Sequence, residues 1–260
     1  MNTDKKEFTD WQEFDPIEYS QRNYWEMLTE DEVIIRLFDK MMNKLWIKES
    51  SFEEAADIWA RPNLYPAMLL LPLVKNKITL LEYSQANRDY VSKILSGEAN
   101  WDYKWHKENW VNYNKRISSM LWSRYRMTLK EIWSRVEIKE WDIYNLPNET
   151  YPAISSFFCS ESITTSKEEF LKAIRSLLSS LKPGWVFVIA HMVWSEWYPA
   201  WHWTSFPAIN LSISDLEETY SSIEEIESYK VEDTNAWDDK LKAREWYHSM
   251  ALVMWKKKRK

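Results

Sequence analysis

The sequence predicts an α/β protein in which helices cover both faces of a mostly parallel sheet. Short apolar runs alternate with stretches of helical period along most of the chain. One run, 186–190, is apolar at every position, which is typical of a strand buried on both faces. Two strand-like segments near the end, 229–232 and 247–254, predict an antiparallel pair.

The composition excludes several classes of protein. With 260 residues, of which 45% are hydrophobic, the chain can bury a full core. A net charge of −6 argues against a nucleic-acid-binding surface. Cys159 is the only cysteine and the four histidines lack metal-ligand spacing, so we expect neither disulfides nor a metal site. A polar start and a short apolar run at 67–74 predict no signal peptide and no membrane span, hence a cytoplasmic protein.

Residues 1–50 carry helix signals and no strand. Asp15 before Pro16 has the form of an N-cap followed by proline at the first helical position. The stretch after Thr29 has acidic residues in its first turn and apolar residues at helical spacing. We therefore predict an N-terminal helical cap, 1–50, and one α/β domain, 51–260.

The first predicted strand, 54–58, leads through a tight loop at 59–63 into a helix that opens near Leu64. In open α/β sheets such a loop holds a nucleotide-like ligand against the N–H groups of the helix start. A loop that a ligand approaches closely favours glycine, whereas Trp59 and Arg61 stand there.

Two segments carry a resemblance to a known family. DIWARPN at 57–63 and ITLLEYSQAN at 78–87 resemble the D-I-G-x-G-P and D-Y-S-x-x-N motifs of the nicotinamide, phenylethanolamine and thioether methyltransferases. The similarity extends to 14–24, 181–185 and 245–254, and so covers nearly the whole chain. It implies a Rossmann-like seven-stranded methyltransferase sheet, S-adenosylmethionine as the cofactor and a small-molecule methyl acceptor.

The predicted cofactor site combines spacing with the resemblance. Glu82 ends the second strand, 78–82, where an acid accepts the ribose hydroxyls of a nucleoside. The resemblance assigns Asp142 to the adenine edge, and a turn acid is the alternative. For the cap tyrosines the alternative is plain core packing. The predicted contacts are Tyr19, Tyr24, Asp57, Trp59, Ala60, Arg61, Asn63, Tyr65, Glu82, Tyr83, Asn87, Asp142, Ile143, Phe157 and Phe158.

The predicted acceptor site follows the fourth and fifth strands, 153–158 and 186–190. His191 stands where the resemblance places an acidic substrate contact, and a structural histidine is the alternative. The predicted substrate contacts are Ser162, His191, Ser195 and Tyr198, with Tyr19 and His191 as candidate catalytic residues. Methyl transfer needs alignment and exclusion of water more than a nucleophilic side chain. We expect a monomer that methylates a small amine or heteroaromatic nitrogen; a degenerate, non-catalytic binding protein is the alternative.

The remaining segments complete the expected alternation. Residues 100–135 alternate aromatic and basic side chains, as in proteins that bind single-stranded nucleic acid. Acidic residues interrupt this run, so we prefer a long helical insertion. A strand is predicted at 136–139. Ser166 and Glu169 predict a capping box for a helix that ends at Pro183-Gly184, and 214–221 predicts another helix.

Tryptophan stands in many places where glycine is expected. The chain has 2 Gly and 18 Trp, whereas an average Gly content of about 7% predicts roughly 18. We hypothesise that many of these codons are UGA read as glycine; a genuinely tryptophan-rich stacking surface is the alternative. Arg61, also a glycine in the resembled family, is not explained. The predicted glycine positions are Trp59, Trp141, Trp185, Trp194, Trp197, Trp201, Trp203, Trp246 and Trp255.

Overall fold

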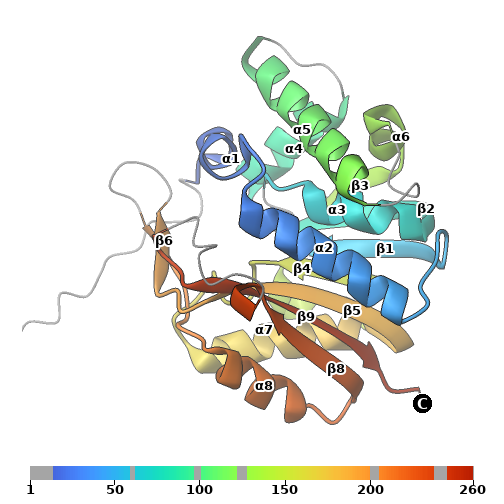
Figure 1. Ribbon diagram of the computed structural model, residues 1–260, viewed down its shortest axis with the longest axis vertical. Helices are drawn as coiled ribbons and strands as arrows, with labels where there is room; N and C mark the ends of the chain where they lie inside the picture. The colour runs from blue at the N-terminus through green and yellow to red at the C-terminus, as the bar shows by residue number, and fades with distance from the viewer. Residues whose placement is uncertain are drawn as a thin grey trace, which may run out of the picture.

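One large sheet organises the part of the chain that the computed structural model describes, residues 14–58, 62–96, 101–121, 128–199, 205–236 and 245–259. The strands are β1 Phe52–Ile58, β2 Val74–Glu82, β3 Val136–Glu140, β4 Tyr151–Phe157, β5 Leu181–Val193, β6 Trp197–Pro199, β7 Ser205–Pro207, β8 Ile226–Asp233 and β9 Ser249–Lys257. Within the described residues, seven strands form the order β3-β2-β1-β4-β5-β9-β8, and β6 pairs separately with β7 (Figure 1). β9 runs antiparallel to both neighbours. The predicted α/β class is confirmed.

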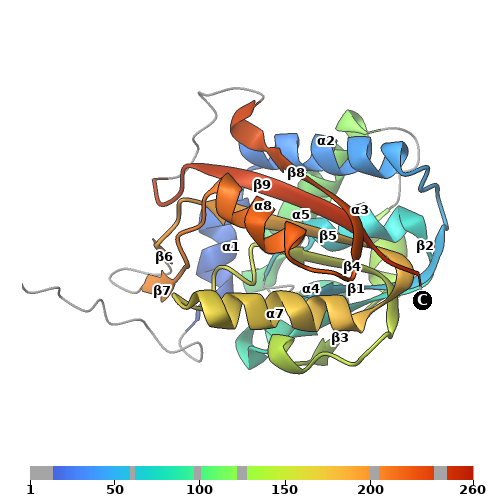
Figure 2. The ribbon, with the colours of Figure 1, turned by 90° about the horizontal axis from the view of Figure 1, so that it is seen from below.

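Helices cover both faces of this sheet. They are α1 Pro16–Tyr24, α2 Thr29–Lys44, α3 Tyr65–Leu70, α4 Gln85–Ser96, α5 Trp101–Met120, α6 Leu129–Ser134, α7 Lys167–Ser180 and α8 Ile213–Ser221, with 3-10 turns η2 Leu71–Leu73, η4 Ile143–Asn145 and η5 Thr234–Ala236. Figure 2 shows α2 and α7 on opposite sides of the sheet. Among the helices of the described part, none is long and apolar enough to cross a membrane.

Alternate side chains of β5 belong to two separate cores. Val188 and Ala190 lie in the cluster that includes α2, whereas Phe187 and Ile189 lie in the cluster that includes α7. A strand that packs on both faces needs apolar residues at every position. The burial of β5 on both faces therefore explains the continuous apolar run at 186–190.

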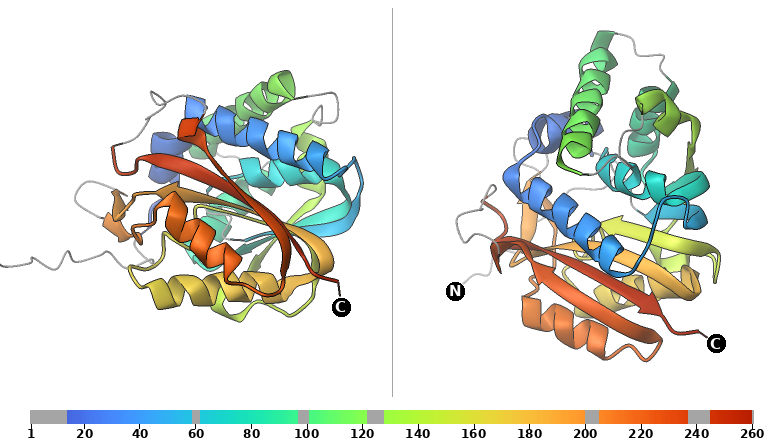
Figure 3. Two further views of the ribbon diagram at one scale, coloured as in Figure 1. Left: turned by 60° about the horizontal axis from the view of Figure 1, so that its bottom comes forward. Right: turned by 45° about the vertical axis from the view of Figure 1, so that its right-hand side comes forward.

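The two N-terminal helices have different places in the fold. Asp15 caps α1 as expected, since its Oδ1 accepts from the N–H of Ile17 at 2.9 Å. α1 contacts α4 and α5, beyond the sheet. α2 instead lies along the face of the sheet against β9 (Figure 3). Its packing makes α2 a layer of the α/β core as much as a cap.

The first turn of α2 differs from the sequence expectation. Glu30 and Asp31 were expected to act through the helix dipole, but both are fully buried. The hydroxyl of Tyr247 donates to the carboxylate of Glu30, and that of Tyr113 donates to Asp31 at 3.1 Å. These bonds join α2 to the start of β9 and to α5.

The predicted end of α7 is wrong. α7 ends at Ser180, and Pro183 and Gly184 lie inside β5. The register between β4 and β5 shifts between Tyr151 and Ala153, and Gly184 has a φ of 80°. A bulge therefore absorbs the turn residues that the sequence suggested as a helix stop.

Only one of the two hydrogen bonds of the predicted capping box at the start of α7 is present. The hydroxyl of Ser166 accepts from the N–H of Glu169 at 3.4 Å, as predicted. The carboxylate of Glu169 instead accepts from the hydroxyl of Thr164. α4 and the β6–β7 pair were not predicted, and β2 begins four residues before the predicted strand, at Val74.

Among the described residues, two tryptophans adopt the left-handed backbone that favours glycine. Trp46 has a φ of 58° and Trp194 a φ of 57°. Trp46 follows α2 in a Schellman motif, in which its N–H donates to Asn43 O at 3.0 Å and that of Ile47 to Met42 O at 3.0 Å. Trp46 is 84% exposed, so little packing compensates for the strain.

These backbone angles bear on the glycine hypothesis. Trp194 is among the nine suggested positions, and Trp46 is a further one that the sequence pattern missed. Trp110 differs from both, because it is fully buried among aromatic rings and packs as a genuine tryptophan does. The backbone therefore fits glycine at Trp46 and Trp194.

Candidate cofactor and acceptor site

Buried polar side chains gather where β1, β2 and β4 end. Asp57 of β1 is 1% exposed and Glu82, the last residue of β2, is fully buried. Ser155 of β4 pairs with Asp57 across the strands, and its hydroxyl donates to Asp57 Oδ1 at 2.5 Å. The carboxyl edge of the sheet thus carries two buried carboxylates.

Asp57 is strongly perturbed by this environment. Burial raises its pKa from 3.8 to about 7, the Ser155 hydrogen bond acts in the lowering direction, and the charge of Glu82 raises it further. The second carboxylate oxygen, Oδ2, is buried and has no hydrogen-bond partner among the described residues. A ligand that presents a donor or a positive charge would satisfy it.

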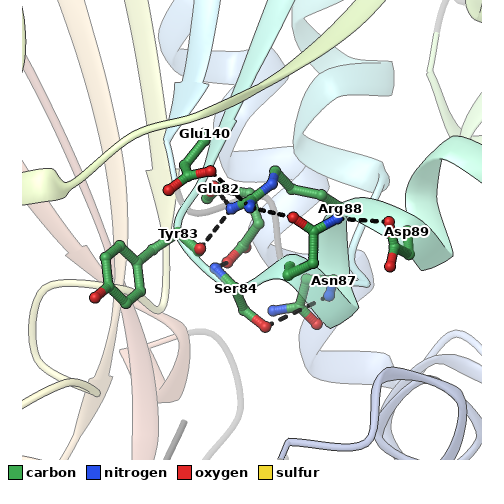
Figure 4. Close-up of polar contacts among 8 residues, drawn as sticks. Glu82, Tyr83, Ser84, Asn87, Arg88, Asp89 and Glu140 are labelled. Atoms are coloured by element: carbon green, nitrogen blue, oxygen red, sulfur yellow. Dashed lines mark hydrogen bonds and ion pairs between the residues drawn. The ribbon is translucent and has the colours of Figure 1, made fainter. Parts of the chain in front are cut away.

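The turn after Glu82 is fixed by hydrogen bonds from its own backbone and from Arg88. Glu82 Oε1 accepts from the N–H of Ser84 at 2.7 Å. Arg88 donates to Glu82 O at 3.0 Å and to the carboxylate of Glu140 at 2.8 Å (Figure 4). Because Glu140 ends β3, Arg88 ties the ends of two strands together and holds the turn into α4.

Asn87, in the first turn of α4, is the second unsatisfied group. Its side chain is buried, and neither Oδ1 nor Nδ2 has a partner in the described part of the chain. Buried amides are nearly always hydrogen-bonded. Asn87 and Asp57 therefore indicate a polar ligand at this edge.

The cap tyrosines have different surroundings. Tyr24 lies in an aromatic cluster, with ring centroids 6.2 Å from Tyr65 and 5.7 Å from Trp110. Tyr19 lies between Tyr24, at 6.0 Å, and Tyr198, at 6.4 Å. Tyr24 mainly joins α1 to the core, whereas Tyr19 reaches the segment after β5.

A small hollow lies beside these rings. Its volume is about 20 Å³, room for a single water. Phe158 lines it with a φ of 58°, a strained backbone of the kind that occurs at binding sites. The lining residues are Tyr19, Asn23, Tyr24, Phe158, Met192, Tyr198, Trp246, Tyr247 and Met250.

His191 does not reach this hollow. It is fully buried on the opposite face of β5, where Nδ1 lies 2.9 Å from Glu161 Oε2 and Nε2 lies 2.5 Å from the hydroxyl of Tyr220. Its ring contacts Phe170 of α7 at 5.8 Å. These contacts support the alternative prediction, a structural role for His191. Successive side chains of a strand point to opposite faces, so it is the next residue, Met192, that lines the hollow.

Both predicted acceptor serines are also enclosed. Ser162 is fully buried, and its hydroxyl lies 3.5 Å from Glu161 Oε1. Ser195 donates to the carbonyl of Trp197 at 3.2 Å. Of the predicted acceptor contacts, Tyr198 alone lines the hollow.

Several predicted cofactor contacts have local structural roles. Asp142 accepts from the N–H of Tyr144 at 2.9 Å and from Asn145 Nδ2 at 3.0 Å, so it acts as the turn acid of η4. Asn63 accepts from the N–H of Tyr65 at 3.2 Å at the start of α3.

The remaining predicted contacts differ in exposure. Ile143 is buried in the α7 core, whereas Tyr83 is 47% exposed. Phe157 packs 5.6 Å from Tyr65. Trp59, Ala60 and Arg61 lie outside the described residues.

Some site residues escaped the sequence analysis. Ser155, Arg88 and Tyr247 lie at the site through cross-strand pairing and long-range contacts, which no local motif marks. Among the described residues no group of three His, Cys, Asp or Glu side chains is arranged to hold a metal.

Solved structures share this fold. The YcgJ protein from Bacillus subtilis matches with a TM-score of 0.51 and 10% identity, over 86% of this chain and 99% of that chain. The methyltransferase domain of bacterial CtHen1 matches with a TM-score of 0.51 and 9% identity, over 88% of this chain and 100% of that chain. The fold is therefore the Rossmann-like fold of methyltransferases.

The sequence itself identifies the family. The sequence model of the NNMT/PNMT/TEMT family matches residues 2–259. The chain therefore belongs to this family of S-adenosylmethionine-dependent methyltransferases, and its cofactor is S-adenosylmethionine. No curated protein sequence matches the chain significantly.

The residues present fit this cofactor. S-adenosylmethionine carries ribose hydroxyls, an amino group and a positively charged sulfonium. A buried carboxylate oxygen on Asp57 and a buried amide on Asn87, both without partners in the described part, offer acceptors and a donor to such groups.

Proposed function

We propose that this methyltransferase transfers a methyl group to a nitrogen of a small molecule, an amine or a heteroaromatic ring. Two features support the proposal: unsatisfied polar groups at Asp57 and Asn87, and an aromatic hollow around Tyr19 and Tyr198. Phe158 of the hollow directly follows β4, the sheet neighbour of the strand that carries Asp57. Polar groups suit a nucleoside, and aromatic faces suit a nitrogen that becomes positively charged as it is methylated.

The proposed roles follow from position. When bound, S-adenosylmethionine supplies an electrophilic methyl group on sulfur. Glu82 accepts the ribose hydroxyls, Asp57 faces the positive charge, and Asn87 bonds the polar groups that remain. Tyr19, Tyr198 and Tyr247 enclose the acceptor and exclude water, so that its lone pair is held in line. A ring nitrogen without a proton needs no general base.

Asn63, Tyr65 and Phe157 form walls of the proposed cofactor site, and Tyr24 and Phe158 contribute both to it and to the hollow. His191, Ser162 and Ser195 are not substrate contacts in this proposal, because each is enclosed by other partners. α1 is the part of the cap that closes over the methyl group.

A catalytically degenerate binding protein is the second candidate. The volume of about 20 Å³ favours it for the chain that carries Trp246, because an amine acceptor does not fit beside that indole. Glycine at 246, as the recoding hypothesis suggests, would enlarge the hollow. The acceptor site therefore depends on the identity of this residue.

Calorimetry and a methylation assay test the proposal. The chain with Trp59→Gly, Arg61→Gly and Trp246→Gly should bind S-adenosylmethionine and S-adenosylhomocysteine and methylate members of a panel of small amines and pyridines. The unsubstituted chain should bind more weakly, because glycine lets a ligand approach the backbone more closely than tryptophan or arginine does. Cofactor binding without turnover on any acceptor would favour the binding protein, and no cofactor binding by either chain would refute the assigned site.

We also propose that the protein is a cytoplasmic monomer. A single cysteine, buried as Cys159, suits a reducing compartment. Light scattering coupled to size exclusion and cell fractionation test the two statements, and a dimer mass or a membrane fraction would contradict them.

A further inference from the structure

A groove lies near the amino ends of the parallel strands, opposite the carboxyl ends that form the cofactor site. Its volume is about 260 Å³, and it runs between the C-terminal end of α2 and the strands β8 and β9. Met254 and Lys256 in its wall pair with Val188 and Val186 of β5, near the start of that parallel strand. Figure 3 shows α2 crossing the sheet beside these strands.

The groove is lined by both apolar and basic side chains. Met41, Leu45 and Met254 form apolar parts of the lining. Lys44 of α2 and Lys230 of β8 belong to the lining as well. The stems of lysine side chains extend an apolar surface, while their ammonium groups stay in water.

The positive charges of the groove repel one another. Burial lowers the pKa of Lys230, and the charges of Lys44 and Lys40 lower it further. The acids nearby offset this in part: Lys230 pairs with Glu232.

The third lysine is similarly placed. Lys256 lies 3.5 Å from Glu227. Three lysines thus converge on one groove of a chain whose net charge is −6. An anion seated among them would gain from charges that the fold itself only partly compensates.

We propose that this groove binds a small amphipathic anion, a carboxylate or phosphate carried on a short alkyl chain or ring. The acid group lies among Lys44, Lys230 and Lys256, and the apolar part rests on Met41 and Leu45. A volume of about 260 Å³ is just below the range of about 300 to 1,000 Å³ of pockets for drug-sized ligands, so the ligand is small.

Titration calorimetry with four probes tests the proposal: hexyl phosphate, hexanoate, inorganic phosphate and hexanol. Hexyl phosphate and hexanoate should bind measurably, and inorganic phosphate and hexanol at least ten-fold more weakly. Lys44→Gln and Lys230→Gln should each weaken hexyl phosphate binding about ten-fold. Lys167→Gln is the matched control, because Lys167 is 54% exposed and belongs to α7 on the other face of the sheet.

A second variant separates the two parts of the groove. Leu45→Gln should weaken hexyl phosphate about three- to ten-fold and leave inorganic phosphate unchanged. Circular dichroism checks that each variant remains folded. No binding of hexyl phosphate, or equal losses with Lys167→Gln, would overturn the proposal, as would inorganic phosphate binding as tightly as hexyl phosphate. Saturable binding of a long acidic peptide without binding of hexyl phosphate would also overturn the proposal.

The test is independent of methyl transfer. None of the groove residues belongs to the cofactor or acceptor site, so the same variants should bind S-adenosylmethionine as the parent does. Failure to bind the cofactor would therefore bear on the proposed function and leave the groove result intact.

Discussion

Two clusters of buried polar side chains differ in whether their hydrogen bonds are complete. In the first, Glu161, His191 and Tyr220, both histidine nitrogens have partners, and Glu161 Oε1 also accepts from the N–H of Met192 at 3.1 Å. In the second, Asp57 and Asn87 keep buried atoms without partners in the described part of the chain. Burial alone therefore does not mark a functional group.

We expect this difference to separate a structural role from a binding role. A satisfied buried network contributes to a unique packing, and its cost appears when one member is removed. Groups with unsatisfied atoms cost stability in the free protein, and a ligand recovers that cost. The first cluster should therefore affect unfolding, and the second should affect ligand binding.

The largest effect is expected for Glu161→Ala. It leaves the buried ring of His191 and the N–H of Met192 without their carboxylate partner, which should lower the free energy of unfolding by about 3 to 5 kcal/mol. Urea denaturation measures this, and the exposed Glu168→Ala in α7 is the control. A normal unfolding curve with abolished methyl transfer would show that the first cluster is catalytic.

The next effect is the pH dependence that Asp57 introduces. Its pKa is about 7 in the fold against 3.8 as the reference value, so between these pH values the folded state holds the extra proton. Stability should therefore fall as the pH rises from 4 to 7 and level off above 7. At about 1.4 kcal/mol per pH unit, the contribution approaches about 4 kcal/mol.

Asp57→Asn isolates this contribution, because asparagine does not titrate. The stability of the parent minus that of the variant, from urea unfolding at each pH, should decline between pH 4 and 7. A difference that rises with pH would mean that Asp57 is charged and stabilising in the free protein.

A smaller effect on binding is expected for Glu82→Ala. In the glycine-restored chain, loss of two charge-assisted hydrogen bonds to ribose should weaken both S-adenosylmethionine and S-adenosylhomocysteine by about 2 to 3 kcal/mol. Calorimetry with both ligands measures this. Unchanged affinities would remove β2 from the cofactor site.

Tyr19→Phe should act on a different step. Since Tyr19 lies on α1, its change should lower turnover more than cofactor affinity. Steady-state assays and calorimetry on the same variant separate the two, and an affinity loss equal to that of Glu82→Ala would place Tyr19 in the cofactor site instead.

The smallest effects concern the left-handed tryptophans. Trp46→Gly and Trp194→Gly should each raise stability by about 1 to 3 kcal/mol. Trp105→Gly, in the interior of α5, should instead lower it by about 1 kcal/mol. Urea unfolding measures all three, and a loss at Trp46 would show that its indole has a packing role.

The codons test the same idea directly. Trp46 and the nine suggested positions should mostly be UGA in the gene, and peptide mass spectrometry of the native protein should detect glycine there. UGG at most of these positions would end the hypothesis.

Local signals predicted much of the fold. Asp15 marked the start of α1, and the apolar run at 186–190 marked a strand with two covered faces. Glu82 was placed at the end of β2 because strand ends follow from short patterns. These features depend on neighbouring residues and so remain visible without the tertiary structure.

Long-range geometry explains the rest. His191 follows the apolar core of β5, but which face it takes depends on where α7 and α8 pack. Ser155 meets Asp57 only because β4 lies next to β1 in the sheet. Thr164 competes for the carboxylate that was expected to complete the capping box at Ser166.

The position of Trp46 has a consequence for making the protein. It lies just before β1, upstream of every strand in the described residues. In a host that reads UGA as a stop, a gene with UGA at that codon yields no more than a short helical fragment. Recombinant production then requires that these codons be replaced by ordinary glycine codons. A chain made in a host that inserts tryptophan at UGA would differ chemically from the native enzyme.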